Sequence, residues 1–158
     1  MADLTHVTYC GLYCRLCGNL ARTPVQASAL KETLQKDGWD QWGEHEITGF
    51  KTFWDVLETL SRLRQTCKGC RGGCGMPNCA IRQCARDRNL EVCSACGDYP
   101  CAHLKTLAER YPNLISDGTR QQQVGLPQWI EEQEARCQTG ACYADFRHPA
   151  KKAQSGST

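Results

Sequence analysis

The chain has 158 residues, thirteen of which are cysteines, and its formal net charge is only +2. Such a length is the size of one domain, and so small a charge favours neither nucleic acid nor a membrane surface as a partner. The sequence has no apolar run of about 18 residues and no secretory signal, so we expect a cytoplasmic protein without a membrane span.

The first predicted feature is a cysteine array near the N-terminus. The stretch "YCGLYCRLC" places Cys10, Cys14 and Cys17 in a C-x-x-x-C-x-x-C pattern. In a reducing cytoplasm, clustered cysteines bind metal or do redox chemistry more often than they form structural disulfides. The array therefore predicts thiol ligands for a metal centre.

Two helices are predicted in residues 25–65, which contain no cysteine. The more regular helix covers residues 50–64, where apolar side chains recur at the three-and-four spacing of one helix face. These side chains are Phe50, Phe53, Trp54, Leu57, Leu60 and Leu63. A less regular helix covers residues 25–38 and ends near Gly38.

Residues 66–101 are dense in cysteine and poor in apolar side chains. The cysteines are Cys67, Cys70, Cys74, Cys79, Cys84, Cys93, Cys96 and Cys101. Because so few large side chains are available for burial, packing alone does not order this stretch, and bound metal is expected to do so. Basic residues dominate residues 62–88, either as charges that offset negative metal sites or as a solvated surface.

The C-terminal part predicts two more helices, over residues 101–111 and 126–137, the second started by Pro127. Residues 146–158 are expected to be a disordered tail. We therefore predict a small, helix-rich fold (α or irregular α+β) with cysteine-rich, metal-bound loops and one metal-binding domain over residues 1–145. In it, the helix of residues 50–64 packs on helices near 102–110 and 127–136.

Three C-x-x-C pairs carry the metal prediction: Cys14 with Cys17, Cys67 with Cys70, and Cys93 with Cys96. The two-residue gap lets both thiolates reach one ion while the backbone turns. The histidines are scattered, which points to all-cysteine sites and to packing or surface roles for His6, His45, His103 and His148. All-cysteine sites suit either iron–sulfur clusters or zinc.

The order of "YCGLYCRLC", "CKGCR", "CAIRQCARDRNLEVCSACGDYPC" and "GLPQWIEEQEARC" resembles that of an uncharacterised cysteine-rich prokaryotic family, domain of unknown function 3795. The resemblance runs from Tyr9 to Cys142. It implies metal binding through Cys10, Cys14, Cys17, Cys67, Cys70, Cys79, Cys84, Cys93, Cys96 and Cys101. Cys74 lies outside the pattern. Members often close with a C-x-x-C pair, whereas Cys137 and Cys142 are separated by four residues, so the sequence leaves open whether this last pair binds metal.

The sequence thus leaves three functions open. The first is an iron–sulfur protein with an electron-transfer or accessory role and a protein or redox partner. The second is a zinc-stabilised binding module without chemistry, and the third is a thiol redox protein. No catalytic residue is identified. As a working partition, we place Cys67, Cys70, Cys79 and Cys84 in one site, while Cys10, Cys14 and Cys17 share ligands with Cys93, Cys96 and Cys101.

Overall fold

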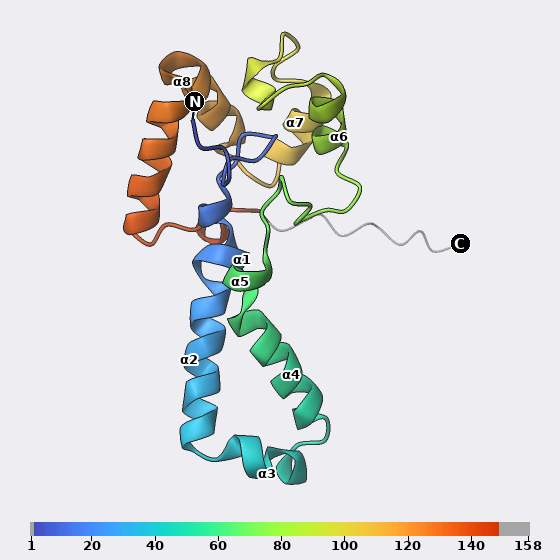
Figure 1. Cartoon of the computed structure of the whole chain (residues 1–158), viewed down its shortest axis with the longest axis vertical. Coiled ribbons are helices and arrows are strands. Elements are labelled where there is room, and N and C mark those ends of the chain that lie inside the picture. Colours follow the sequence, from blue (N-terminus) through green and yellow to red (C-terminus); the bar gives the residue numbers. More distant parts are fainter. Residues whose placement is uncertain (1, 149–158) are drawn as a thin grey trace, which may run out of the picture.

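A computed structural model describes residues 2–148, which form helices joined by loops (Figure 1). With η marking a 3₁₀-helix, the elements are η1 (Cys14–Leu16), α1 (Gly18–Ala21), α2 (Thr23–Lys36), α3 (Trp39–Glu46), α4 (Phe50–Ser61), α5 (Leu63–Thr66), α6 (Ala80–Asp87), η2 (Cys93–Ala95), α7 (Ala102–Ala108), α8 (Leu114–Gln138) and η3 (Tyr143–Asp145). Extended pairing in the described part is limited to one bridge, between Val7 and Tyr13. The predicted small, helix-rich fold is confirmed. None of the described helices is both long and apolar enough to span a bilayer.

Helices α2, α3 and α4 form an arm, residues 23–61, that projects from the rest of the molecule (Figure 1). Helix α2 packs along α4, and α3 lies across the far end of both. The chain reverses direction at Gly38 and Gly49, which have φ angles of +79° and +82°. Side chains rarely adopt such angles, so these glycines suit the two turns. Because its turns are short, the arm is made of local contacts.

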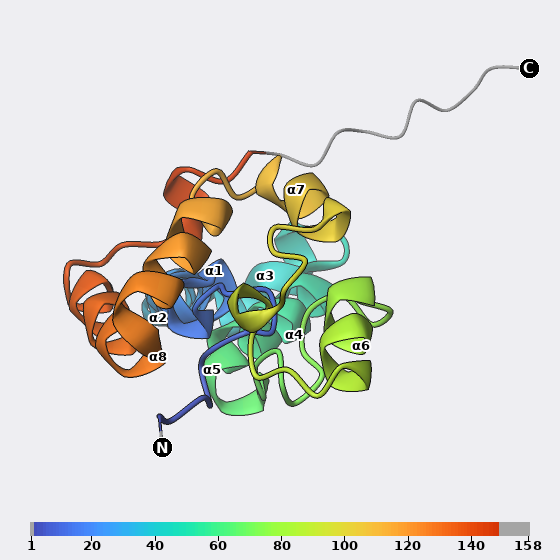
Figure 2. The ribbon, with the colours of Figure 1, turned by 90° about the horizontal axis from the view of Figure 1, so that it is seen from above.

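The remaining elements form a head, residues 2–17 and 67–148, with α1 and α5 at the base of the arm. Seen along the arm, α6 and α8 lie on opposite sides of the head (Figure 2). The indole of Trp129 is fully buried and meets the ring of Tyr13 edge-on, with centroids 5.9 Å apart. Around them pack buried side chains from distant segments: Val7, Leu12, Leu16, Ile81, Val92, Leu104, Leu114 and Tyr143.

The predicted packing of the helix of residues 50–64 on the C-terminal helices is wrong. Helix α4 packs chiefly on α2, whereas α7 and α8 pack on each other. The physical reason is local: the apolar face of α4, centred on Phe50 and Leu57, is covered by the neighbouring arm helices. The helices themselves were placed correctly, since α2 ends before Gly38 and α4 begins at Phe50.

The C-terminal region contains both predicted helices, and the first half of α8, before Gly125, is a further helix that was not predicted. Helix α8 bends at Gly125, where the backbone leaves helical geometry, so its second half begins near Pro127. Of the predicted tail, residues 149–158 lie outside the described part of the chain. The described residues before them contact the head, because the amide of Arg147 donates to the carbonyl of Tyr143 and that of His148 to Arg110.

Candidate metal centre

Two C-x-x-C pairs, Cys14–Cys17 and Cys93–Cys96, adopt the same backbone turn. In each pair the amide of the second cysteine donates to the carbonyl of the first, at 2.9 and 3.0 Å. Each turn is a short 3₁₀-helix flanked by extended residues. A short backbone turn of this kind is what a metal-binding knuckle uses to bring its two thiolates to one ion.

The first thiol set is Cys14, Cys17, Cys67 and Cys70, where the N-terminal loop meets the loop of residues 67–79. Burial raises the pKa of Cys14 to about 11, and the nearby thiols of Cys70, Cys17 and Cys67 oppose its ionisation further. Burial likewise raises the pKa of Cys67, with Cys74 and Cys17 close enough to contribute. Thiols held this close share one environment, in which an added positive ion would relieve their mutual repulsion.

Backbone amides of the 67–79 loop point at sulfurs, one in the first set and one at the neighbouring Cys74. The amide of Lys68 donates to Cys74 Sγ at 3.2 Å, and the amide of Cys70 faces the thiol of Cys14. Amides aimed at sulfur stabilise thiolates and are part of how proteins support thiolate-bound metals. Cys74 lies outside the family's sequence pattern, although its position, with three residues between it and Cys70, was the available signal.

The second thiol set is Cys84, Cys93, Cys96 and Cys101, which together line a cavity of about 160 Å³. Burial raises the pKa of Cys93 to about 12, and the other three thiols of the set add to this effect. His103 also lines the cavity. Arg88 donates from Nη1 to Cys96 Sγ at 3.3 Å and forms an ion pair with Asp98. The cavity is thus lined by four thiols and a cation, together with apolar side chains such as Leu90 and Leu104.

This grouping differs from the working partition, in which Cys84 joined Cys67, Cys70 and Cys79. Helix α6 is the reason, because Cys79 caps its N-terminus while Cys84 lies beyond its first turn and faces η2 and α7. Cys10 and Cys79 lie between the two sets. Burial raises the pKa of Cys10 to about 11, with contributions from Cys70 and Cys79, and Cys10 in turn influences Cys93.

The arginines of residues 62–88 have a role that neither sequence interpretation predicted, because several of them donate hydrogen bonds to backbone carbonyls. Arg71 Nε donates to the carbonyls of Leu4 and Val7, and Arg82 Nη2 donates to those of Cys74 and Met76. Arg82 is buried, and its Nε atom has no hydrogen-bond partner. These contacts tie the 67–79 loop to the N-terminal loop and to α6.

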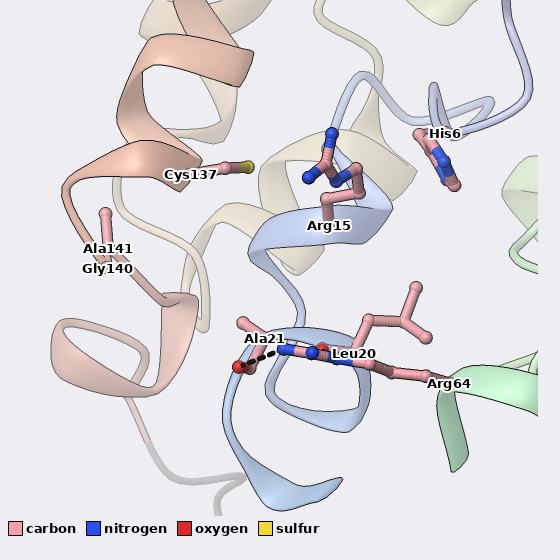
Figure 3. A pocket seen from close by; sticks show the side chains of 8 residues that line it. All are labelled: His6, Arg15, Leu20, Ala21, Arg64, Cys137, Gly140 and Ala141. Atoms are coloured by element: carbon pink, nitrogen blue, oxygen red, sulfur yellow. Dashed lines mark hydrogen bonds between the residues drawn. The ribbon is translucent and has the colours of Figure 1, made fainter. Parts of the chain in front are cut away.

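The last two cysteines are placed apart from both sets. Cys137 lines a second cavity, of about 340 Å³, together with His6, Arg15 and Arg64 (Figure 3). Cys142 is fully buried, and its sulfur accepts the amide of Asp145 in η3. The structure therefore brings neither residue into a thiol set.

All thirteen cysteines are free thiols in the structure. Within residues 2–148, no group of three or more histidine, cysteine or acidic side chains is placed to hold a metal ion. The thiols are clustered without closing around one ion position. The strand–helix setting of a thioredoxin-like C-x-x-C pair is not found in the described residues either, since the Cys93–Cys96 turn is preceded by a loop.

The sequence profile described as "Protein of unknown function (DUF3795)" matches residues 6–106. The chain belongs to this family. The DUF3795 match contains both thiol sets and the whole arm, but it ends before α8. Cys137 and Cys142, which the sequence analysis included in the resemblance, lie outside it. No curated protein and no solved structure matches the chain.

Proposed function

We propose that this DUF3795 protein is a cytoplasmic iron–sulfur protein with an electron-transfer or accessory role. Its clusters would be held by the two thiol sets. The observation that carries the proposal is the second set, in which four thiols from α6, η2 and the start of α7 line one cavity. Such all-thiolate ligation is what iron–sulfur clusters require.

The size of the cavity favours a cluster over a single ion. A tetrahedral zinc site is closed, with sulfurs about 2.3 Å from the metal and no space between them. The cavity that Cys84, Cys93, Cys96 and Cys101 line, together with side chains such as Leu90, Tyr99 and Arg88, has about 160 Å³, which is more space than one ion fills. A group of several atoms fits this space better than one ion does.

Charge supports the same assignment. Four thiolates around a cluster leave a negative group, which nearby guanidinium groups stabilise. Arg88 already contacts Cys96 in the second set. Arg82, beside the 67–79 loop, is a buried cation that forms no ion pair within the described residues. A buried charge without a counter-charge is costly, and a negative cluster at the first set would offset it.

When bound, such a cluster supplies a one-electron redox centre. The residues of this chain would hold the cluster, exclude water and set its reduction potential. Hydrogen bonds to the ligand sulfurs raise the potential, so the amides near Cys14 and the guanidinium of Arg88 are the groups that tune it. A redox partner would then exchange electrons with the centre.

Metal and acid-labile sulfide analysis with an optical spectrum, on protein purified without oxygen, tests the proposal. We expect iron and sulfide in equal amounts, about four of each per cluster, and an absorbance near 400 nm that bleaches on reduction. The Cys96→Ser variant is expected to lose one cluster, whereas Cys137→Ser, outside both sets, keeps the full content. A colourless anaerobic preparation without iron would refute the proposal.

A zinc-stabilised module is the second candidate, because the matching turns at Cys14–Cys17 and Cys93–Cys96 are equally suited to zinc knuckles. It predicts stoichiometric zinc, no sulfide and no visible spectrum. The same analysis therefore separates the two candidates.

A further inference from the structure

Exposed apolar side chains are concentrated on the arm. Seven large apolar side chains are exposed in the described residues, and six of them belong to residues 23–61: Val25, Leu30, Trp42, Ile47, Phe53 and Val56. The seventh is Met76, in the head. Single exposed apolar residues are ordinary on protein surfaces, but a concentration on one projecting element marks an interaction surface.

Three of the six form a tip patch, defined as Trp42, Ile47 and Phe53. Their exposed fractions are 38%, 50% and 42%. A chain of ring contacts joins Trp42 to Phe53: centroids lie 4.1 Å apart for Trp42–Trp39, 5.6 Å for Trp39–Phe50 and 5.5 Å for Phe50–Phe53. The carbonyl of Ile47 accepts the amide of Phe50. Trp42 and Phe53 thus share an aromatic base, to which Ile47 is joined through the backbone. The three residues belong to α3, the turn after it and the first turn of α4, at the end of the arm far from the head (Figure 1).

The rim of this patch is acidic. Residues 23–61 hold seven acidic side chains and three lysines, and every lysine is already paired: Lys31 with Glu58, Lys36 with Glu32, and Lys51 with Asp55. The acids left without an ion pair in the described part are Asp37, Asp40, Glu44 and Glu46. Asp37 directly precedes the turn at Gly38, and the other three lie in α3. The excess negative charge of the arm thus gathers at the tip patch.

We propose that the tip patch binds a basic amphipathic helix of a partner protein. Such a helix presents an apolar stripe to Trp42, Ile47 and Phe53 while its lysines or arginines meet the unpaired acids, which is the usual complementarity of helix recognition. A second copy of this chain would bring an equally acidic tip, and like charges at an interface repel. An anionic membrane surface is disfavoured by the same repulsion. The arm contains no cysteine, so this inference does not rest on the metal proposal.

A synthetic helical peptide of leucine and lysine is the probe, with a leucine–glutamate peptide of the same pattern as its control. Binding is followed on the full-length protein by tryptophan emission. Three of the four tryptophans lie in the arm, and the fourth, Trp129, is fully buried in the head. We expect a saturable blue shift with the lysine peptide, weakened by salt, and none with the glutamate peptide.

Matched variants test the location. The triple variant Asp40→Asn/Glu44→Gln/Glu46→Gln removes three charges at the tip and is expected to weaken peptide binding about tenfold. The triple variant Asp87→Asn/Glu91→Gln/Glu131→Gln removes three exposed charges from the head and is expected to bind as the unchanged protein does. Trp42→Ala, checked for helix content by circular dichroism, is expected to weaken binding while leaving the charges intact.

Several results would overturn the proposal: no saturable binding, equal binding of both peptides, or a tip variant that binds as tightly as the head variant. Sedimentation analysis tests whether a second copy of this chain occupies the patch instead. A dimer that the tip variant abolishes would assign the patch to a second copy of this chain and would also overturn it.

Discussion

The arm of this protein and the 67–79 loop of its head are ordered by different means. The arm has no cysteine and holds together through ring packing around Phe50, whose neighbours include Trp39 and Trp54. The head contains all thirteen cysteines, and in its 67–79 loop only a glycine, Gly69, is buried. That loop is held by arginine contacts to carbonyls instead of by an apolar core. One chain thus combines two regions that fold by burial, the arm and the head's core around Trp129, with a loop in which burial is too small to suffice.

The largest expected effect is that of metal removal. Strong chelation under anaerobic conditions should unfold the cysteine loops of the head while the arm stays helical, because a structural metal site contributes on the order of 10 kcal/mol that the loops cannot replace. Hydrogen exchange checks this at named amides. Those of Cys74 and Cys96, which donate to Gly69 and Cys93, should lose protection, while that of Phe53 keeps it. Full protection of the loops in demonstrably metal-free protein would show that the head is ordered without metal.

The second largest effect is expected from Gly118→Ala, because Gly118 in the core of the head contacts Tyr99, a residue beside the second thiol set. A Cβ atom at Gly118 in α8 would lie 2.0 Å from Tyr99 Oη, and Tyr99 lines the cavity of the second thiol set. Gly118→Ala must therefore displace the tyrosine, with a cost of about 1 to 3 kcal/mol for overpacking. We expect a lower unfolding midpoint and a reduced metal content of one site.

Gly97→Ala is the control for that substitution, because a Cβ atom there meets nothing within 4 Å and Gly97 directly follows Cys96. Equal loss of metal in both variants would mean that the helix contact at Gly118 is not the cause.

The fold was predictable where the physics is local. The helices at residues 23–36 and 50–61 follow from their apolar spacing and, for the first, from Gly38 shortly after its end, and the second half of α8 follows from Pro127. Their partners were not predictable, because an apolar stripe such as that of Phe50 and Leu57 does not specify which helix covers it. The choice of α2 came from short turns that keep the arm's contacts within residues 23–61.

The candidate site was predictable in composition but not in arrangement. Spacing identified the paired cysteines, since C-x-x-C is a local geometry. It could not group Cys84 with Cys93, Cys96 and Cys101, because that set depends on how α6 packs beside η2 and α7. Nor could it reveal that Arg71 and Arg82 bind carbonyls, because such contacts join segments far apart in sequence. Whether these cysteines bind metal stays a prediction.

A smaller effect is expected in the arm from Gly43→Ala. A Cβ atom at Gly43 would lie 2.6 Å from two ring carbons of Phe50, the residue on which the arm's aromatic packing is centred. The ring can shift into the partly open tip, so we expect a cost near the lower end of about 1 to 3 kcal/mol. Thermal unfolding followed by tryptophan emission measures it. Gly18→Ala, with open space around the added methyl group, serves as the control.

The smallest effect is expected from Glu58→Gln, which tests whether charge or ring packing holds the arm together. Glu58 accepts hydrogen bonds from Lys31 and Arg62 at 3.2 and 2.6 Å, and the contact with Lys31 is the first reason that its carboxyl pKa is lowered. Ion pairs at an exposed surface contribute little, because water and salt screen them. The unfolding midpoint should therefore match that of the unchanged protein within experimental scatter. Glu58→Gln removes one charge and keeps the size of the side chain. If it destabilised the arm as much as Gly43→Ala does, we would conclude that charge pairing, and not aromatic burial, orders α2 against α4.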